Sequence, residues 1–327
     1  MKLALAPMAT LSHEALRVLI HRYGDPDEYF SEMIHAPSFI AGGRFEEWYV
    51  RTAPVPERMV WQLTGHTADL MARAAALLVP FGGIGIDLNM GCCAPDIARS
   101  GAGIAWMLKD EAEVAAMVRA VRSSIDSAPG RRLRLSVKLR LGADEDYPRL
   151  LSFCRMLVSE GTELITLHPR VRSDKYSRPA RRAFVGRLAA DLSVPVYGNG
   201  DVHSAEDARD YAAAYPSAGL MLGRFAVQKP WIFRQIRDPG ITAREPLVVD
   251  HLEVSRFLLD ELRRVLFRSP PEFQLSRAHR FFWYYSDNFS FAHHVQSRVR
   301  NTKTPDEIRG VIADYLDQVP QDRYLSV

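Results

Sequence analysis

The chain has 327 residues, of which 47% are hydrophobic and 25% charged, with a formal net charge of +3 at pH 7. This composition is ordinary for a globular protein and excludes a disordered or fibrous chain. Its 3 cysteines are too few for a disulfide framework, and no apolar run approaches the length of a membrane helix. We therefore expect a cytoplasmic protein with no membrane segment.

The first two thirds of the chain alternates strand and helix patterns. Strands are expected at 3–6, 28–32, 59–63, 84–89, 133–139, 164–168, 194–198 and 219–222. Helices are expected between them at 14–21, 67–79, 111–127, 147–160, 180–191 and 205–214, with Ser12 and Ser204 as N-caps. Such alternation implies a parallel sheet, and eight strands in a segment of this length favour a closed (β/α)8 TIM barrel. A Rossmann fold is disfavoured because Gly82-Gly83-Ile84-Gly85 precedes a strand and does not follow one.

The pattern changes near residue 237. Asp238-Pro239-Gly240 is a turn signal, and helices are expected beyond it at 249–267, 277–288, 293–301 and 305–316. The sequence therefore predicts two domains, a barrel over 1–237 and an all-helical domain over 238–327.

Polar or chemically special residues follow most of the expected strands. The most informative stretch is Ile86–Cys93, a buried strand that ends in a glycine turn carrying a thiol. Read in chain order, the strand ends supply Pro7 and Met8, Gln62, Asn89 and Cys92, Lys138 and Arg140, His168 and Arg170, Asn199-Gly200-Asp201, and Gly223-Arg224. Each residue alone has a structural explanation, but the carboxyl ends of barrel strands converge on one site. The sequence therefore predicts an active site at these ends.

The last two strand ends are typical of a phosphate site. Gly200 and Gly223 let backbone amides approach a ligand closely, and Arg224 adds a fixed cation. Barrels often bind phosphate at this place, although these glycines have an alternative role as turn residues. We expect Lys138, deep in the barrel mouth, to stabilise negative charge on a reduced cofactor ring.

Several motifs together resemble one enzyme family. They are Ala6-Pro7-Met8, Asp87-Leu88-Asn89-Met90-Gly91-Cys92, Gly101-Ala102-Gly103-Ile104-Ala105, Val137-Lys138-Leu139-Arg140-Leu141-Gly142, His168-Pro169-Arg170, Gly198-Asn199-Gly200-Asp201, Met221-Leu222-Gly223-Arg224 and, more weakly, Arg280-Phe281-Phe282-Trp283-Tyr284. In these stretches the chain resembles the tRNA-dihydrouridine synthases. The resemblance implies a flavin-dependent barrel with a C-terminal helical domain, FMN as cofactor, NADPH as hydride donor and tRNA as substrate.

The resemblance also implies residue roles. FMN would be held by Pro7, Met8, Ala9, Gln62, Lys138, His168, Asn199, Gly200, Asp201, Gly223 and Arg224. Asn89 would position the uracil, and Cys92 would donate the proton to carbon-5 after hydride addition at carbon-6. Cys93 stands where the family has proline and is an alternative thiol. Thr10 and His13 also depart from the family pattern, and a threonine at position 10 is expected to crowd the flavin.

Basic residues point to a nucleic-acid partner. Between Arg170 and Arg187, seven cations face Asp174 alone, and residues 263–303 carry eight cations against Glu272 and Asp287. The candidate tRNA contacts are Arg140, Arg170, Arg172, Lys175, Tyr176, Arg277 and Arg280. Such runs also occur on solvated faces. His293-His294 lacks matching metal-ligand spacing, so no metal is expected, and nothing in the sequence indicates an obligate protein partner.

Two other functions stay open at this point. One is a flavin-dependent barrel that reduces a small pyrimidine-like molecule. This function would not explain the basic helical domain. The other is a tRNA-binding relative without catalysis, which the changes at positions 10 and 93 keep possible.

Overall fold

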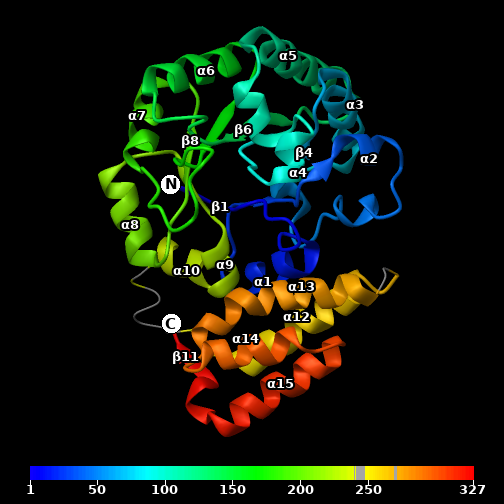
Figure 1. Cartoon of the computed structure of the whole chain (residues 1–327), viewed down its shortest axis with the longest axis vertical. Coiled ribbons are helices and arrows are strands. Elements are labelled where there is room, and N and C mark those ends of the chain that lie inside the picture. The colour runs from blue at the N-terminus through cyan, green and yellow to red at the C-terminus, as the bar shows by residue number, and fades with distance from the viewer. Residues whose placement is uncertain (239, 241–246, 269–270) are drawn as a thin grey trace.

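The structure is a computed structural model that describes residues 1–238, 240, 247–268 and 271–327. A barrel surrounded by helices forms one part of the molecule, and a layer of C-terminal helices packs against one side of it (Figure 1). Of the expected turn at 238–240, Pro239 lies outside the described residues. Among the described helices, none combines the length and the apolar character needed to cross a membrane.

Eight parallel strands close into the predicted barrel. They are β1 (Lys2–Leu5), β2 (Glu28–Phe30), β4 (Met59–Thr64), β5 (Gly85–Met90), β6 (Arg134–Leu139), β7 (Leu164–Leu167), β8 (Val196–Asn199) and β9 (Gly219–Leu222). The ring closes because β1 pairs with both β9 and β2, and β2 pairs with β4. A two-residue strand, β3 (Ile34–His35), pairs in parallel with the carboxyl end of β4.

Helices follow the strands and cover the outside of the barrel (Figure 1). The main ones are α1 (Glu14–Tyr23), α3 (Ala68–Leu78), α5 (Glu111–Ser127), α6 (Tyr147–Ser159), α7 (Ala183–Asp191) and α8 (Ala205–Ala214). Shorter helices are α2 (Ala36–Ile40), α4 (Pro95–Arg99), α9 (Arg224–Gln228) and α10 (Ile232–Arg237), with 3-10 turns at Glu46–Trp48, Pro56–Arg58, Val79–Phe81 and Gly103–Leu108.

The N-caps of two helices test the sequence prediction. Ser204 caps α8 as expected, because its side chain accepts the N–H of Asp207. Ser12 does not cap α1; its hydroxyl donates to Ala6 and accepts the N–H of Met8, while His13 takes the cap position. The predicted cap was therefore wrong by one residue, because the serine is used to fix the loop that follows β1.

The barrel interior is built from alternate residues of each strand. At its amino end, the guanidinium of Arg134 donates to both carboxylate oxygens of Glu28, at 2.9 and 2.7 Å, and the Tyr197 hydroxyl donates to Glu28 at 3.0 Å. An apolar layer lies above, formed by Ala4, Ala6, Phe30, Val60, Leu164 and Met221. The Arg134–Glu28 ion pair and the apolar side chains thus fill the amino end of the barrel. The open end is the one formed by the carboxyl ends of the strands.

The C-terminal region consists mainly of α12 (His251–Val265), α13 (Pro271–Tyr285), α14 (Ala292–Arg300) and α15 (Pro305–Gln318), with 3-10 turns at Ser286–Asn288 and Pro320–Asp322. Four helices were expected here, but an antiparallel ribbon of β10 (Val248–Asp250) and β11 (Tyr324–Ser326) was not. Strands of three residues carry too little periodicity to be read from sequence. Because residues 248–250 form β10, the helix expected from 249 starts at His251, and Asp250 is its N-cap.

The C-terminal helices dock on the barrel through α12 and α13. Helix α1 packs against α12, and α9 packs against α13. Arg264 of α12 pairs with Glu14 at 2.9 Å, and the ring of Phe273 in α13 lies 4.8 Å from that of Phe45. This docking brings α13 to the open end of the barrel.

Candidate functional site

One continuous cavity opens at the carboxyl ends of the strands. Its outer part has a volume of about 600 Å³ and its inner recess about 110 Å³. The two parts share six lining residues, namely Pro7, Met8, Lys138, His168, Tyr176 and Arg224. The other predicted residues on its wall are Ala9, Gln62, Asn89, Cys92, Arg140, Lys175, Asn199, Gly200, Asp201, Gly223 and Arg280. The predicted convergence of the strand ends is therefore what the structure shows.

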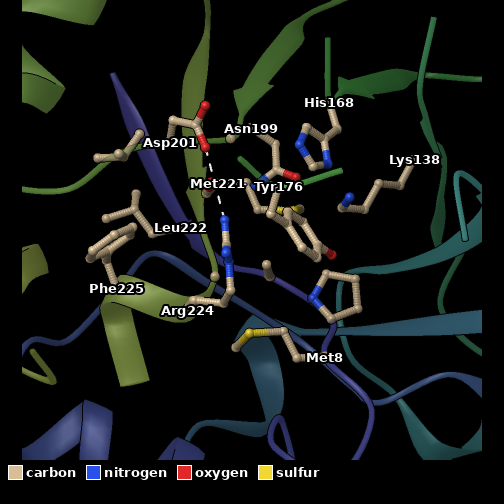
Figure 2. Close-up of a pocket in the computed structure, with 15 residues that line it drawn as sticks. Met8, Lys138, His168, Tyr176, Asn199, Asp201, Met221, Leu222, Arg224 and Phe225 are labelled. Carbon is tan, nitrogen blue, oxygen red and sulfur yellow. Dashed lines mark hydrogen bonds and ion pairs between the residues drawn. The ribbon is translucent and has the colours of Figure 1, made fainter. Parts of the chain in front are cut away.

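The inner recess has the chemistry of an anion site. Arg224 lies at its edge, 3.9 Å from the Asp201 carboxylate (Figure 2). Among the described residues, the backbone N–H groups of Gly200, Gly223 and Arg224 find no hydrogen-bond acceptor. A Cβ on Gly200 would lie 2.9 Å from the ring of His168, and the backbone there has a φ of +113°, so glycine is required. These donors fit a phosphate group.

His168 is held as a neutral donor beside this recess. Its Nε2 lies 2.9 Å from the guanidinium of Arg170, which only donates, so the ring proton is on Nδ1. Burial lowers the pKa of His168 well below its usual value, and the positive charge of Lys138 lowers it further. The imidazole is therefore uncharged at neutral pH.

Lys138 supplies an unpaired cation to the cavity. Its side chain points from β6 toward the space around Tyr176 and His168 (Figure 2). Burial lowers its pKa to about 8, although the nearby Asp87 carboxylate opposes that shift. Within the described part of the chain, no carboxylate lies within 4 Å of its ammonium group. An unpartnered ammonium next to a phosphate site fits the negatively charged ring system of a reduced flavin.

Cys92 lies on the outer cavity wall in the turn after β5. Its N–H donates to Asn89 Oδ1 at 3.0 Å, and its carbonyl accepts the N–H of Ile104. A Cβ on Gly103 would lie 2.6 Å from that carbonyl, which explains the glycine in the Gly101–Ala105 motif. Cys93 lines the same wall, and burial raises the pKa of its thiol.

Two residues predicted to contact tRNA are turned inward. Arg170 is 1% exposed, and its guanidinium bonds His168, the Asp201 carboxylate, and the carbonyls of Tyr176 and Arg178. Arg277 of α13 is 7% exposed and lies over the ring of Phe273. Both side chains are engaged in the protein's own packing, and direct contact of either with tRNA stays a prediction.

The basic loop is also less charged than its sequence indicates. Arg181 pairs with Asp174 and Glu145, and Arg182 pairs with Asp207. Of the candidate contacts in this loop, Arg172 and Lys175 are exposed and form no ion pair with any described residue. Lys175 lines the cavity and Arg172 lies outside it.

Thr10 does not crowd the cavity as expected. It is absent from the cavity wall, and its hydroxyl donates to the carbonyl of Ala9. Its φ of +62° is a left-handed conformation that favours glycine, and its N–H donates to the buried carboxylate of Glu32. The departure at position 10 therefore affects the backbone of this loop and not the room in the cavity.

Tyr284 was named only as part of the Arg280–Tyr284 motif and not as a site residue, yet it lines the outer cavity together with Arg280. The two residues are four positions apart in α13 and therefore lie on one face of that helix. That spacing was the available signal. The barrel and the C-terminal helices consequently share one cavity.

Similarity to known proteins identifies the family of this chain. The family model described as dihydrouridine synthase (Dus) matches residues 4–316, which covers the barrel and most of the C-terminal helices. The chain belongs to the dihydrouridine synthase family. It is 33% identical over 260 residues to tRNA-dihydrouridine synthase B of Pseudomonas syringae pv. tomato, covering 80% of this chain and 75% of that protein. It is 29% identical over 324 residues to tRNA-dihydrouridine(16) synthase of Neisseria meningitidis serogroup B, covering 96% and 94%.

Solved structures of other enzymes share the barrel. A morphinone reductase variant has a TM-score of 0.52 at 9% identity, covering 72% of this chain and 86% of that one. A 2-naphthoyl-CoA reductase has a TM-score of 0.54 at 10% identity over 72% of this chain, which spans 50% of the reductase. These likenesses show the fold alone.

Membership in the dihydrouridine synthase family makes the chain a flavin-dependent oxidoreductase. The flavin fits the cavity on the observations above, namely the free amides of the recess and the unpaired ammonium of Lys138. Among the described residues, no group of three or more His, Cys, Asp or Glu side chains is placed to hold a metal ion.

Proposed function

We propose that this chain is a tRNA-dihydrouridine synthase that uses FMN and NADPH to reduce the 5,6 double bond of uridine in tRNA. The observation that carries the proposal is that Lys138 and Cys92 line one cavity, together with Arg224 of the phosphate-type recess and Arg280 of α13. The names of the Pseudomonas and Neisseria relatives support the same substrate.

In this proposal the recess holds the FMN phosphate through Arg224 and the amides of Gly200 and Gly223. Pro7, Met8, Ala9, Gln62, His168, Asn199 and Asp201 shape the rest of the cofactor site, Asp201 indirectly, since its carboxylate is engaged by Arg170 and the N–H of Ala180. When bound and reduced, FMN supplies a hydride to carbon-6 of the uracil.

The protein supplies the proton that completes the reduction. Hydride addition at carbon-6 leaves negative charge on the uracil carbonyl and carbon-5, and Cys92 donates its thiol proton to carbon-5. Asn89 keeps the turn of Cys92 in place and orients the base, while Lys138 stabilises negative charge in the barrel mouth. The target base must leave its stack to enter the cavity.

The tRNA contacts proposed lie at the cavity rim and on its wall. These are Lys175 and Arg280 on the wall and Arg172 outside it, together with Tyr176 and the buried Arg140, whose guanidinium donates to the carbonyl of Val171. Arg280 and Tyr284 favour RNA over a free pyrimidine, because a small substrate would not need the C-terminal helices at the wall.

The test is direct. The purified protein is incubated with NADPH and tRNA from cells that lack dihydrouridine, and the digested nucleosides are analysed by mass spectrometry. A gain of two mass units on uridine that is lost in C92A and kept in C93A supports the proposal. No gain from flavin-loaded protein contradicts it, and reduction of free uracil in place of tRNA would favour the small-molecule function.

A further inference from the structure

A chain of buried hydrogen bonds leads from the middle of the barrel to the turn of Cys92. The Ser136 hydroxyl donates to Asp87 Oδ1 at 2.7 Å, and Gln62 Nε2 donates to Asp87 Oδ2 at 2.7 Å. Asn89 Nδ2 then donates to Gln62 Oε1 at 3.0 Å. Asn89 Oδ1 accepts the N–H groups of Gly91 and Cys92, at 3.2 and 3.0 Å. Asp87, Gln62 and Ser136 are each 0% exposed.

The direction of these bonds follows from the carboxylate of Asp87. An ionised carboxylate only accepts hydrogen bonds, so the amide of Gln62 must turn its NH2 toward Asp87. Gln62 then presents its oxygen to Asn89, which must turn its own NH2 inward. As a result the Asn89 oxygen faces the two backbone N–H groups of the turn.

With Gln62 reversed, its oxygen would face the Asp87 carboxylate and its NH2 would face the NH2 of Asn89. With Asn89 reversed as well, its NH2 would face the N–H groups of Gly91 and Cys92, and these donors would lose their acceptor. Burial raises the pKa of Asp87 to about 6, while the bonds from Gln62 and Ser136 oppose that rise. Both carboxyl oxygens accept a hydrogen bond, from Gln62 and from Ser136, and these bonds favour the ionised form that directs the chain.

We propose that Asp87 and Gln62 are positioning residues whose hydrogen bonds fix the amide of Asn89 and thereby hold Cys92 at the cavity wall. Asp87 is distant from the thiol in this chain of bonds and acts through two amides. The relevance to catalysis rests on the proposed function, in which Cys92 donates a proton. The placement of the thiol itself does not depend on that function.

The substitution D87N tests the direction of the chain, because asparagine has the same shape and adds a donor. It permits both amides to reverse, and we expect the turn to loosen. The rate of alkylation of Cys92 by iodoacetamide at pH 8, measured by mass spectrometry on the flavin-loaded protein, should rise on the order of fivefold, the size expected for the loss of about one hydrogen bond. The Cys92 rate of the wild-type protein under the same conditions is the reference.

Two further variants separate the effect of hydrogen-bond direction from a general disturbance of the barrel interior. S136A removes a bond in the same network but leaves Asp87 an acceptor, so the Cys92 rate should stay within about twofold of wild type. In the double variant D87N/Q62E, the new amide donates to the new carboxylate, which again accepts from Asn89. This variant should fold and return the Cys92 rate to within about twofold of wild type, whether or not D87N folds alone.

An unchanged Cys92 rate in D87N would overturn the proposal, as would a double variant that fails to fold or does not restore the rate. Turnover is a separate readout: D87N should lower kcat by a larger factor than it raises the KM for tRNA, because the cationic contacts at the cavity rim are left in place. If the thiol rates behave as expected but no variant or wild type reduces uridine, the positioning stands and the proposed function fails.

Discussion

The guanidinium of Arg170 provides the sharpest test of what burial does to a charged residue in this protein. Sequence reasoning placed Arg170 among the tRNA contacts, whereas the structure leaves it 1% exposed and paired with an Asp201 carboxylate that is 14% exposed. Removing one partner of a buried pair typically costs about 3–5 kcal/mol, because the other charge stays buried. The N–H of Ala180, and Arg224 at 3.9 Å, still stabilise Asp201, so we expect the lower end.

The R170A variant should therefore lose about 3 kcal/mol of unfolding free energy, which corresponds to a fall in melting temperature of about 6–12 °C for a domain of this size. R170K should recover only part of this loss, since an ammonium cannot bond Asp201, His168 and two carbonyls together. The measurements are calorimetry and urea unfolding of the flavin-free and flavin-loaded protein.

Arg172 is the matched control because it is exposed and has no ion pair with a described residue. R172A should melt within about 1–2 °C of wild type but bind tRNA more weakly, with a salt dependence reduced by about one counterion. The reverse result, an R170A protein of normal stability that binds tRNA weakly at the wild-type flavin content, would refute the reasoning from burial.

Three further predictions concern the cavity and the barrel interior. G200A should lower flavin affinity and destabilise the protein by about 2 kcal/mol or more, because its Cβ would meet His168. G42A, with a φ of +65° and no atom within 4 Å of a new Cβ, should cost about 1 kcal/mol. Equal midpoints of urea unfolding for the two variants would contradict this. Since burial lowers the pKa of Lys138 to about 8, the unfolded chain binds more protons above that pH, and the stability contribution of this group should rise from about pH 8 to 10.5 in flavin-free protein and vanish in K138M. T166V should be neutral or stabilising by about 1 kcal/mol in thermal unfolding, because the buried Thr166 hydroxyl has no hydrogen-bond partner among the described residues. A clear loss of stability would show that it has one.

The fold was predictable because its signals are local. Strand and helix periods, and the rule that barrel strands end at one face, follow from the order of residues along the chain. Helix ends were less predictable: α7 was expected from 180 but begins at Ala183.

The candidate site divides in the same way. The residue types at the strand ends, among them Lys138, Cys92 and Gly200, were set by the sequence, and their meeting in one cavity follows from barrel geometry. The sequence could not show which cations face outward. The loop between Arg170 and Arg187 reads as strongly basic because its neutralising partners, including Glu145 and Asp207, lie elsewhere in the chain.

By itself, then, the sequence determined the barrel, the C-terminal helices and the chemistry available at the open end. Only the tertiary structure decided that Arg170 is a buried ion-pair partner, that Tyr284 lines the cavity, and that Asp87 sets the direction of the bonds leading to Cys92. The physical reason is that period and propensity act over a few residues. Charge pairing, burial and hydrogen-bond direction depend instead on groups that folding brings together from distant parts of the chain.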